Sequence, residues 1–257
     1  MHDGLRELMI STLAKLDIGV MRLSRQKELE AKESASFDLA LLMELPEEHT
    51  ARLLRLLRSS RSQFRQDLFV LSQVDFKREG YFVEFGATNG VHLSNTCLLE
   101  KEFGWSGILA EPGKRWHEEL KRNRSCHVET DCVWKDSNSS LTFNETEIGE
   151  YSTIDDFSGG YAKRHAHRYK VNTISLADML EKYDAPRIID YMSIDTEGSE
   201  FAILSAFDFD RYKFNFLTVE HNYSSTRQDV LRLLTAKGYR RTMEHLMTIE
   251  DWYVREQ

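Results

Sequence analysis

The chain has 257 residues, of which 41% are hydrophobic and 30% are charged, and its formal net charge is -8. A chain of this length and composition can bury a real core, which excludes intrinsic disorder, collagen and a coiled-coil fibre. The excess of acidic residues argues against a nucleic-acid partner, because contact with phosphates needs a cationic field.

The sequence carries no sign of a membrane segment. No stretch approaches the roughly 18 consecutive apolar residues that a bilayer-spanning helix needs, and residues 1–4 lack a basic start followed by an apolar block. The three cysteines form no CxxC pair and are odd in number, so we expect reduced thiols. These features predict a cytoplasmic protein with no transmembrane segment.

Residues 1–60 are predicted to form a helical region, and residues 61–257 the main domain. Apolar side chains recur at helical spacing from Leu5 to Leu23, a second helix is expected over Phe37–Leu45, and a third begins near Pro46. One face of the third helix is basic, with Arg52, Arg55, Arg58 and Arg61. We expect a helical cap or a homo-oligomer contact; attachment to an anionic substrate or membrane surface stays open.

From Gln66 onward, short apolar runs alternate with helical segments, which is typical of βαβ units around a parallel sheet. The predicted strands are Tyr81–Ala87, Gly107–Glu111, His127–Trp134, Ile188–Asp195 and Phe216–His221. The predicted helices are Ser94–Phe103, Trp116–Arg122, Leu176–Tyr183, Glu197–Phe207 and Thr226–Lys237. Two further strands, Tyr239–Leu246 and Asp251–Arg255, are too close together for a helical crossover and predict an antiparallel hairpin at the sheet edge.

The first strand breaks into a turn of small residues that suits a nucleotide-like ligand. Gly86 and Gly90 permit backbone conformations that a β-carbon would block, and a helix opens near Ser94. The third glycine of a GxGxxG dinucleotide fingerprint is missing, which disfavours a nicotinamide oxidoreductase.

Acidic residues close the next two strands. Glu111 follows Gly86 by about 25 residues and stands where a carboxylate accepts hydrogen bonds from both ribose hydroxyls. Asp131, followed by Cys132, closes the third strand, where it would accept a hydrogen bond from an adenine amino group. We expect Cys132 to be a packed thiol rather than a nucleophile.

Two later strand ends bring acid–base groups to the same edge of the sheet. Asp195 and Glu197 follow one strand, and Glu220 and His221 end the next. The imidazole of His221 is the natural general base. Alternatively, Asp195, Glu220 and His221 hold a divalent cation that lowers the pKa of a coordinated hydroxyl.

A polar, glycine-bearing segment, residues 150–160, precedes a basic one, residues 161–168. We predict a mobile lid whose Arg164, His165 and Arg168 contact the acceptor; a solvated connector is the alternative.

These segments together resemble the FkbM-type methyltransferase family over residues 62–255. The resemblance rests on the runs QDLFV (66–70), FVEFGA (82–87), LLEK (98–101), AEP (110–112), SIDTEGSE (193–200) and VEHN (219–222). It implies a Rossmann-like class I methyltransferase fold, an α/β fold with a mostly parallel seven-stranded sheet and a C-terminal antiparallel hairpin. It also implies S-adenosylmethionine as the cofactor. One departure is Thr88-Asn89, where relatives have Asn-Asp, so an amide would replace an acidic cofactor contact.

By this resemblance the methionine part of the cofactor contacts Gly86, Ala87, Asn89 and Gly90, with Glu111 at the ribose and Asp131 at the adenine. Glu84, Ser94, Pro112 and Cys132 complete the expected cofactor site, and the expected catalytic set is Asp195, Glu197, Glu220 and His221. The predicted function is O-methylation of a small-molecule or glycan hydroxyl. The alternatives are a phosphate-bearing or nitrogen acceptor, and a non-catalytic nucleoside-binding assembly module.

Overall fold

The computed structural model describes residues 23–158 and 166–256. It forms two compact units, Met1–Met43 and Glu44–Gln257. The first unit contains most of the helix α2 (Leu23–Glu44), which includes the helix predicted over Phe37–Leu45. The helix predicted N-terminal to Leu23 lies outside the described residues. Within those residues, no helix combines the length and the apolar character needed to cross a bilayer.

Three short helical segments open the second unit. After Pro46, the chain forms η1 (Glu47–His49) and α3 (Thr50–Leu56), and α4 follows at Gln66–Gln73. The guanidinium of Arg52 lies 4.0 Å from the centroid of the Phe76 ring. At least one arginine of the predicted basic face therefore packs within this unit.

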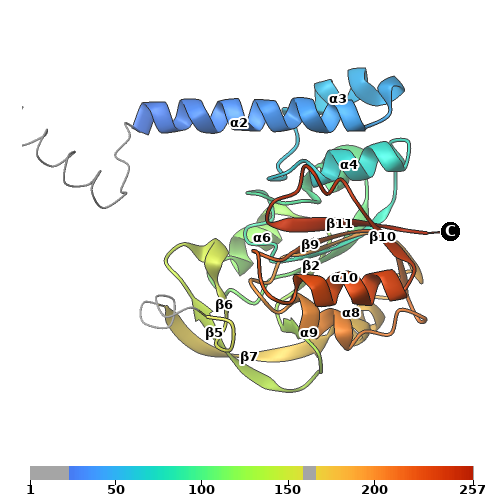
Figure 1. Ribbon diagram of the computed structural model, residues 1–257. Coiled ribbons are helices and arrows are strands. Elements are labelled where there is room, and N and C mark those ends of the chain that lie inside the picture. Colours follow the sequence, from blue (N-terminus) through green and yellow to red (C-terminus); the bar gives the residue numbers. More distant parts are fainter. Residues whose placement is uncertain (1–22, 159–165, 257) are drawn as a thin grey trace, which may run out of the picture. The chain divides into compact units, whose positions relative to one another are not determined.

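A seven-stranded sheet forms the centre of the second unit (Figure 1). Its strand order is β10 (Tyr239–Thr242), β11 (Glu250–Arg255), β9 (Lys213–Glu220), β8 (Ile188–Ile194), β1 (Tyr81–Phe85), β2 (Ser106–Ala110) and β3 (His127–Glu129). Neighbouring strands from β9 to β3 are parallel, whereas β11 runs antiparallel to both β9 and β10. This arrangement confirms the predicted class I methyltransferase fold with its C-terminal hairpin.

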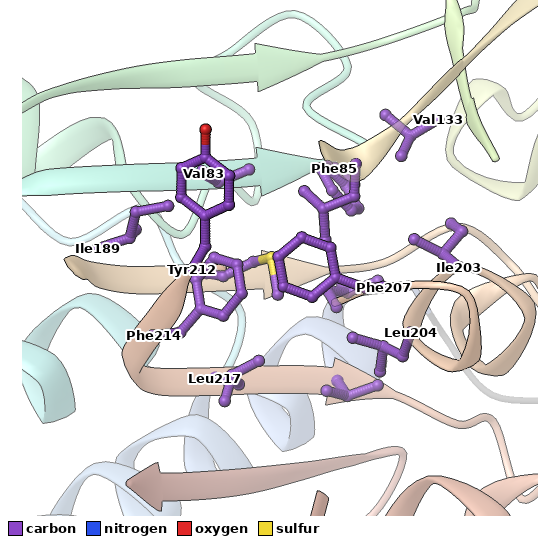
Figure 2. Close-up of a cluster of buried hydrophobic side chains, with 14 of the residues drawn as sticks. Val83, Phe85, Val133, Ile189, Ile203, Leu204, Phe207, Tyr212, Phe214 and Leu217 are labelled. Atoms are coloured by element: carbon purple, nitrogen blue, oxygen red, sulfur yellow. The ribbon is translucent and has the colours of Figure 1, made fainter. Parts of the chain in front are cut away.

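Helices cover both faces of this sheet. The crossover helices are α5 (Cys97–Phe103), α6 (His117–Asn123), α8 (Leu176–Lys182), α9 (Glu200–Ser205) and α10 (Arg227–Ala236). Side chains of α8, α9 and α10 share one buried cluster with side chains of β1, β8 and β9, part of which Figure 2 shows. On α4, the ring of Phe69 lies 4.5 Å from that of Trp252 on β11. Burying each such side chain contributes roughly 1.5–3 kcal/mol, so the core holds the strand ends in place.

A second sheet of four strands, absent from the sequence prediction, stands beside the first. Its order is β4 (Cys132–Trp134), β7 (His167–Ser175), β5 (Ser140–Glu145) and β6 (Thr153–Ile154), with a short helix η2 at Gly149–Tyr151. The predicted single strand over His127–Trp134 is wrong. The Glu129 carboxylate accepts hydrogen bonds from the backbone N–H groups of Thr130 (2.8 Å) and Asp131 (2.9 Å), so the ladder breaks there.

Candidate functional site

A cavity of about 630 Å³ opens where β1, β2, β8 and β9 end. Gly86, Glu111, Asp195 and Glu220 line it, and each stands at the carboxyl end of one of these strands. Parallel α/β sheets bind their ligands at this edge. Ile148, Gly149 and residues 151–154, which include β6, form a further part of the wall.

The turn after β1 passes close to the end of β8. Gly86 has φ +69°, and a Cβ atom built there would stand 2.2 Å from the carbonyl oxygen of Asp195. Strained backbone recurs around the cavity, because Thr88 (φ 44°), Glu197 (φ 57°) and Asn222 (φ 40°) all line it with positive φ. Such strain persists where the surrounding structure fixes the loops.

Glu84 lines the cavity, but its carboxylate organises the loop after β1. It accepts hydrogen bonds from the Asn95 backbone N–H (2.7 Å), the Ser94 hydroxyl (3.0 Å) and the Thr96 hydroxyl. Glu84 therefore fixes the start of α5, and with it Asn95, which also lines the cavity.

Arg124, a residue that the sequence analysis missed, binds the same loop through several hydrogen bonds. Its buried guanidinium donates to the carbonyl of Gly90 (2.9 Å), to the hydroxyls of Ser94 and Thr96, and to the Glu100 carboxylate (2.7 Å). A lone basic residue just after a helix gave no signal in the sequence.

Five residues expected at the cofactor do not line the cavity: Ala87, Asn89, Gly90, Ser94 and Asp131. The Asn89 side-chain oxygen instead accepts from the backbone N–H groups of Val91 (3.0 Å) and His92 (2.9 Å). A Cβ atom at Gly90 would stand 2.6 Å from side-chain atoms of both Leu120 and Arg124. The contacts of Asn89, Gly90 and Ser94 thus support the loop behind the cavity.

Glu111 lies in the cavity at the end of β2. Its carboxylate accepts hydrogen bonds from the backbone N–H groups of Thr88 (2.8 Å) and Gly113 (2.7 Å). Burial raises its pKa to about 7, although both hydrogen bonds act in the opposite direction. A fixed carboxylate with free lone pairs is the group that vicinal hydroxyls need.

Beside Glu111, Pro112 and Cys132 also line the cavity, whereas Asp131 does not. Burial raises the pKa of the Cys132 thiol to about 12, so it stays neutral and is unsuited to nucleophilic attack. Ile148 and Tyr151 line the cavity and are mostly exposed. Between them, Gly149 lets the chain approach the Trp116 ring, because a Cβ atom there would stand 2.5 Å from it.

Asp195, Glu197 and Glu220 form a cluster of three carboxyl groups, here called the acidic trio. One oxygen of each lies within 4.8 Å of the others. Asp195 is exposed to the cavity, and desolvation by the surrounding protein raises its pKa to about 7. Burial, and then the charges of Asp195 and Glu197, raise the pKa of Glu220 far above its usual range. Asp195 and Glu220 are therefore positioned to share a proton.

The loop that carries Asp195 and Glu197 is held on two sides. The buried Glu200 carboxylate accepts from the backbone N–H groups of Thr196 and Gly198, both at 3.0 Å. From β6, the Thr153 hydroxyl donates to the carbonyls of Thr196 (3.2 Å) and Glu197 (3.1 Å). The second sheet thus supports one side of the acidic trio.

His221 does not line the cavity. Its Nδ1 accepts a hydrogen bond from the backbone N–H of Tyr223 (3.0 Å), and its Nε2 lies 3.9 Å from Asp251. Burial lowers its pKa, so the ring is neutral. The carboxylate that joins Asp195 and Glu220 is that of Glu197, in the place where the sequence analysis put His221.

The expected acceptor contacts are only partly described. Arg164 and His165 lie outside the described residues. Arg168, on β7, pairs with Asp155 at 2.9 Å and does not line the cavity. Other polar side chains line it instead, notably Gln66, Asn95, Asn222 and Glu250. Gln66 and Asn222 stand in the family-like runs, but the sequence analysis gave them no role.

Two solved methyltransferases are among the structures that the chain resembles. The chain resembles the precorrin-6y C5,15-methyltransferase of Geobacter metallireducens (TM-score 0.40, 10% identity, 73% of this chain and 85% of that one). It also resembles a putative RNA methyltransferase of Pyrococcus horikoshii (TM-score 0.38, 12% identity, 75% and 82%). None of the curated proteins matches significantly. The methyltransferase FkbM domain matches residues 84–241, more than half of the chain. The protein therefore belongs to the FkbM-domain methyltransferases, which use S-adenosylmethionine.

Proposed function

We propose that the protein is an O-methyltransferase that acts on a hydroxyl of a sugar, glycan or related natural product. The observation that carries the proposal is the pairing, in one cavity, of the fixed Glu111 carboxylate with the acidic trio. Glu111 offers the hydrogen-bond acceptors that a ribose requires. The acidic trio offers a group that takes a proton from a hydroxyl.

Glu111 would hold the ribose of S-adenosylmethionine, and Pro112 and Cys132 would flank its adenine. Gly86 keeps the turn after β1 free of side-chain atoms next to Asp195. The cofactor supplies the methyl group, activated by its bond to a positively charged sulfur. Because the strand ends of β1 and β8 touch, a methyl group bound above Gly86 would face the acidic trio.

The acidic trio would orient the acceptor and take its proton. When bound, the cofactor would supply the methyl group to the acceptor oxygen, and the Asp195–Glu220 pair would take the proton that the hydroxyl loses. These carboxyl groups suit proton transfer near neutral pH because burial and mutual repulsion make them stronger bases than exposed carboxylates. The general base proposed here is thus a carboxylate rather than His221.

A second candidate for the same step is a divalent cation held by the acidic trio. Three carboxylate oxygens within 4.8 Å favour a hard cation such as Mg²⁺ or Ca²⁺. Electron paramagnetic resonance of added Mn²⁺ tests this, with Glu197→Gln as the weakened variant. Free Mn²⁺ at all protein concentrations would exclude the cation.

The cofactor assignment is tested by calorimetry with S-adenosylhomocysteine. We expect saturable binding that Glu111→Ala weakens at least tenfold, because it removes a charge-assisted hydrogen-bond acceptor. Unchanged affinity would remove Glu111 from the ribose site. Screening labelled methyl transfer against sugars, phosphate esters and amines, with mass spectrometry of the product, then separates a hydroxyl acceptor from a phosphate-bearing or nitrogen acceptor. A silent assembly module would bind cofactor and label nothing.

We also propose a cytoplasmic protein whose N-terminal helices form a homo-oligomer contact. Light scattering of the full chain and of a variant lacking residues 1–43 tests that contact. The same particle stoichiometry in both would refute it.

A further inference from the structure

The cavity is rich in carboxyl groups and poor in cations. Six of its lining residues are acidic: Glu84, Glu111, Asp195, Glu197, Glu220 and Glu250. Four carry amides: Gln63, Gln66, Asn95 and Asn222. Among the described lining residues, none is lysine or arginine. A ligand that brings negative charge to the acidic trio would meet like charges without a counter-ion, and this repulsion is unfavourable at short range.

Two buried oxygen atoms in the lining lack a hydrogen-bond partner: Asn95 Oδ1 and Glu220 Oε2. Their residues are only 9% and 8% exposed. Buried polar groups in native proteins are almost always hydrogen-bonded. Two acceptors without a partner, on residues that line the same cavity, therefore favour a ligand that donates hydrogen bonds.

The orientation of the Asn95 side chain is fixed by a hydrogen bond to β8. Its Nδ2 donates to the Ser193 hydroxyl (2.9 Å), which also accepts from the Thr218 hydroxyl (3.3 Å). Ser193 pairs with Glu84 on β1 and Thr218 on β9, and it stands two residues before Asp195. The Asn95 amide is thus anchored at the strands that carry the acidic trio.

We propose that this end of the cavity is an ammonium subsite, so that the acceptor is an amino alcohol, such as an amino sugar, with its charged amine next to the methylated hydroxyl. The inference rests on the proposed function. A primary ammonium offers three donors and no acceptor, which matches Asn95 Oδ1, Glu220 Oε2 and the Glu197 carboxylate. Its charge also offsets the repulsion within the acidic trio, which a neutral hydroxyl cannot do.

Saturation-transfer NMR on the complex with S-adenosylhomocysteine tests the subsite, in EDTA so that no metal ion takes the carboxylates. The probes are glucosamine, N-acetylglucosamine and glucose 6-phosphate, which share a ring but carry an ammonium, a neutral amide and a phosphate. We expect glucosamine to bind at least tenfold more tightly than the other two. Equal binding, tighter binding of either other sugar, or no binding of glucosamine would overturn the proposal.

A pair of variants assigns the effect to the cavity. Glu197→Gln removes one charge from the acidic trio and should abolish the preference for glucosamine over N-acetylglucosamine. Glu118→Gln removes one charge from an exposed position outside the cavity lining and should leave the preference unchanged. A preference that survives Glu197→Gln would overturn the subsite.

Failure of this inference is distinguishable from failure of the proposed function. Calorimetry of S-adenosylhomocysteine alone tests the cofactor site. Binding of S-adenosylhomocysteine without a preference for glucosamine refutes only the ammonium subsite, whereas absence of cofactor binding refutes the function on which it rests.

Discussion

The carbonyl oxygen of Asp195 lies so close to Gly86 that a Cβ atom at position 86 would stand 2.2 Å from it. Two strand ends, β1 and β8, therefore meet without side-chain atoms between them. This contact brings the proposed cofactor turn against the acidic trio.

Replacing Gly86 by alanine should lower the free energy of unfolding by more than the positive φ of this residue alone explains. Gly104 has the same φ, +69°, but no atom lies within 4 Å of a Cβ built there. We expect Gly104→Ala to lower the free energy of unfolding by about 1–2 kcal/mol, and Gly86→Ala by roughly 1–3 kcal/mol more. Urea denaturation measures both. Equal losses would contradict the close approach.

The free energy of unfolding of the cofactor-free protein should fall as pH rises, because Glu111 is buried. Its pKa is about 7 in the fold, against an ordinary value of 4.5. The folded protein therefore keeps a proton that the unfolded chain has released, and the free energy of unfolding falls between about pH 4.5 and 7 by roughly 3 kcal/mol.

Glu111→Gln should remove that part of the pH dependence. It should also lower stability at both pH 5 and pH 8, because its side-chain NH2 would face one of the two backbone N–H groups that Glu111 binds. The same variant should bind S-adenosylhomocysteine more weakly, since an amide replaces a carboxylate acceptor. Urea denaturation at pH 5 and pH 8 provides the test. If the free energy of unfolding changes with pH equally in Glu111→Gln and in the wild type, Glu111 ionises normally.

The strand ends could be predicted from the sequence because apolar runs and small-residue turns are local signals. Glu111, Asp195, Glu197 and Glu220 directly follow or end such runs, so their approach to one cavity follows from strand order alone. His221 shows the limit. The position of a residue along a strand predicts where its backbone lies. The contacts that fix the His221 ring come from Tyr223 in the following turn and from Asp251 on the neighbouring strand β11, which is distant in the sequence.

The second sheet and the loop supports could not be predicted in the same way. The alternation in β7, where Val171 is buried between exposed neighbours, is a strand signal, but the basic residues at the start of this strand suggested a lid. Arg124 and Asn95 acquire their roles only through long-range contacts, which no local pattern records.

Arg124 should be essential for the loop after β1. Arg124→Met would leave Glu84 and Glu100 without their buried counter-charge, and we expect a loss of about 3–5 kcal/mol in unfolding free energy. Hydrogen exchange should rise over residues 88–96, and S-adenosylhomocysteine should bind more weakly. Arg122→Met, at an exposed position in the last turn of the preceding helix α6, is the control. Similar effects of both variants would contradict the role of Arg124.

The last prediction separates the two candidates for the general base. Glu220 lies in the acidic trio, whereas the His221 ring is held outside the cavity by Tyr223. Glu220→Gln should lower kcat by about 100-fold or more, the usual contribution of a general base, while the affinity for S-adenosylhomocysteine stays the same.

His221→Ala should instead leave kcat within about tenfold of wild type and lower stability, because it creates a cavity beside Asp251. Acceptor turnover measured for both variants at saturating cofactor decides between them. A large loss of kcat in His221→Ala alongside normal turnover in Glu220→Gln would return the base to the imidazole. If kcat falls strongly in both variants, then His221 and Asp251 act by holding Glu220 in position. Glu220 directly precedes His221 and ends β9.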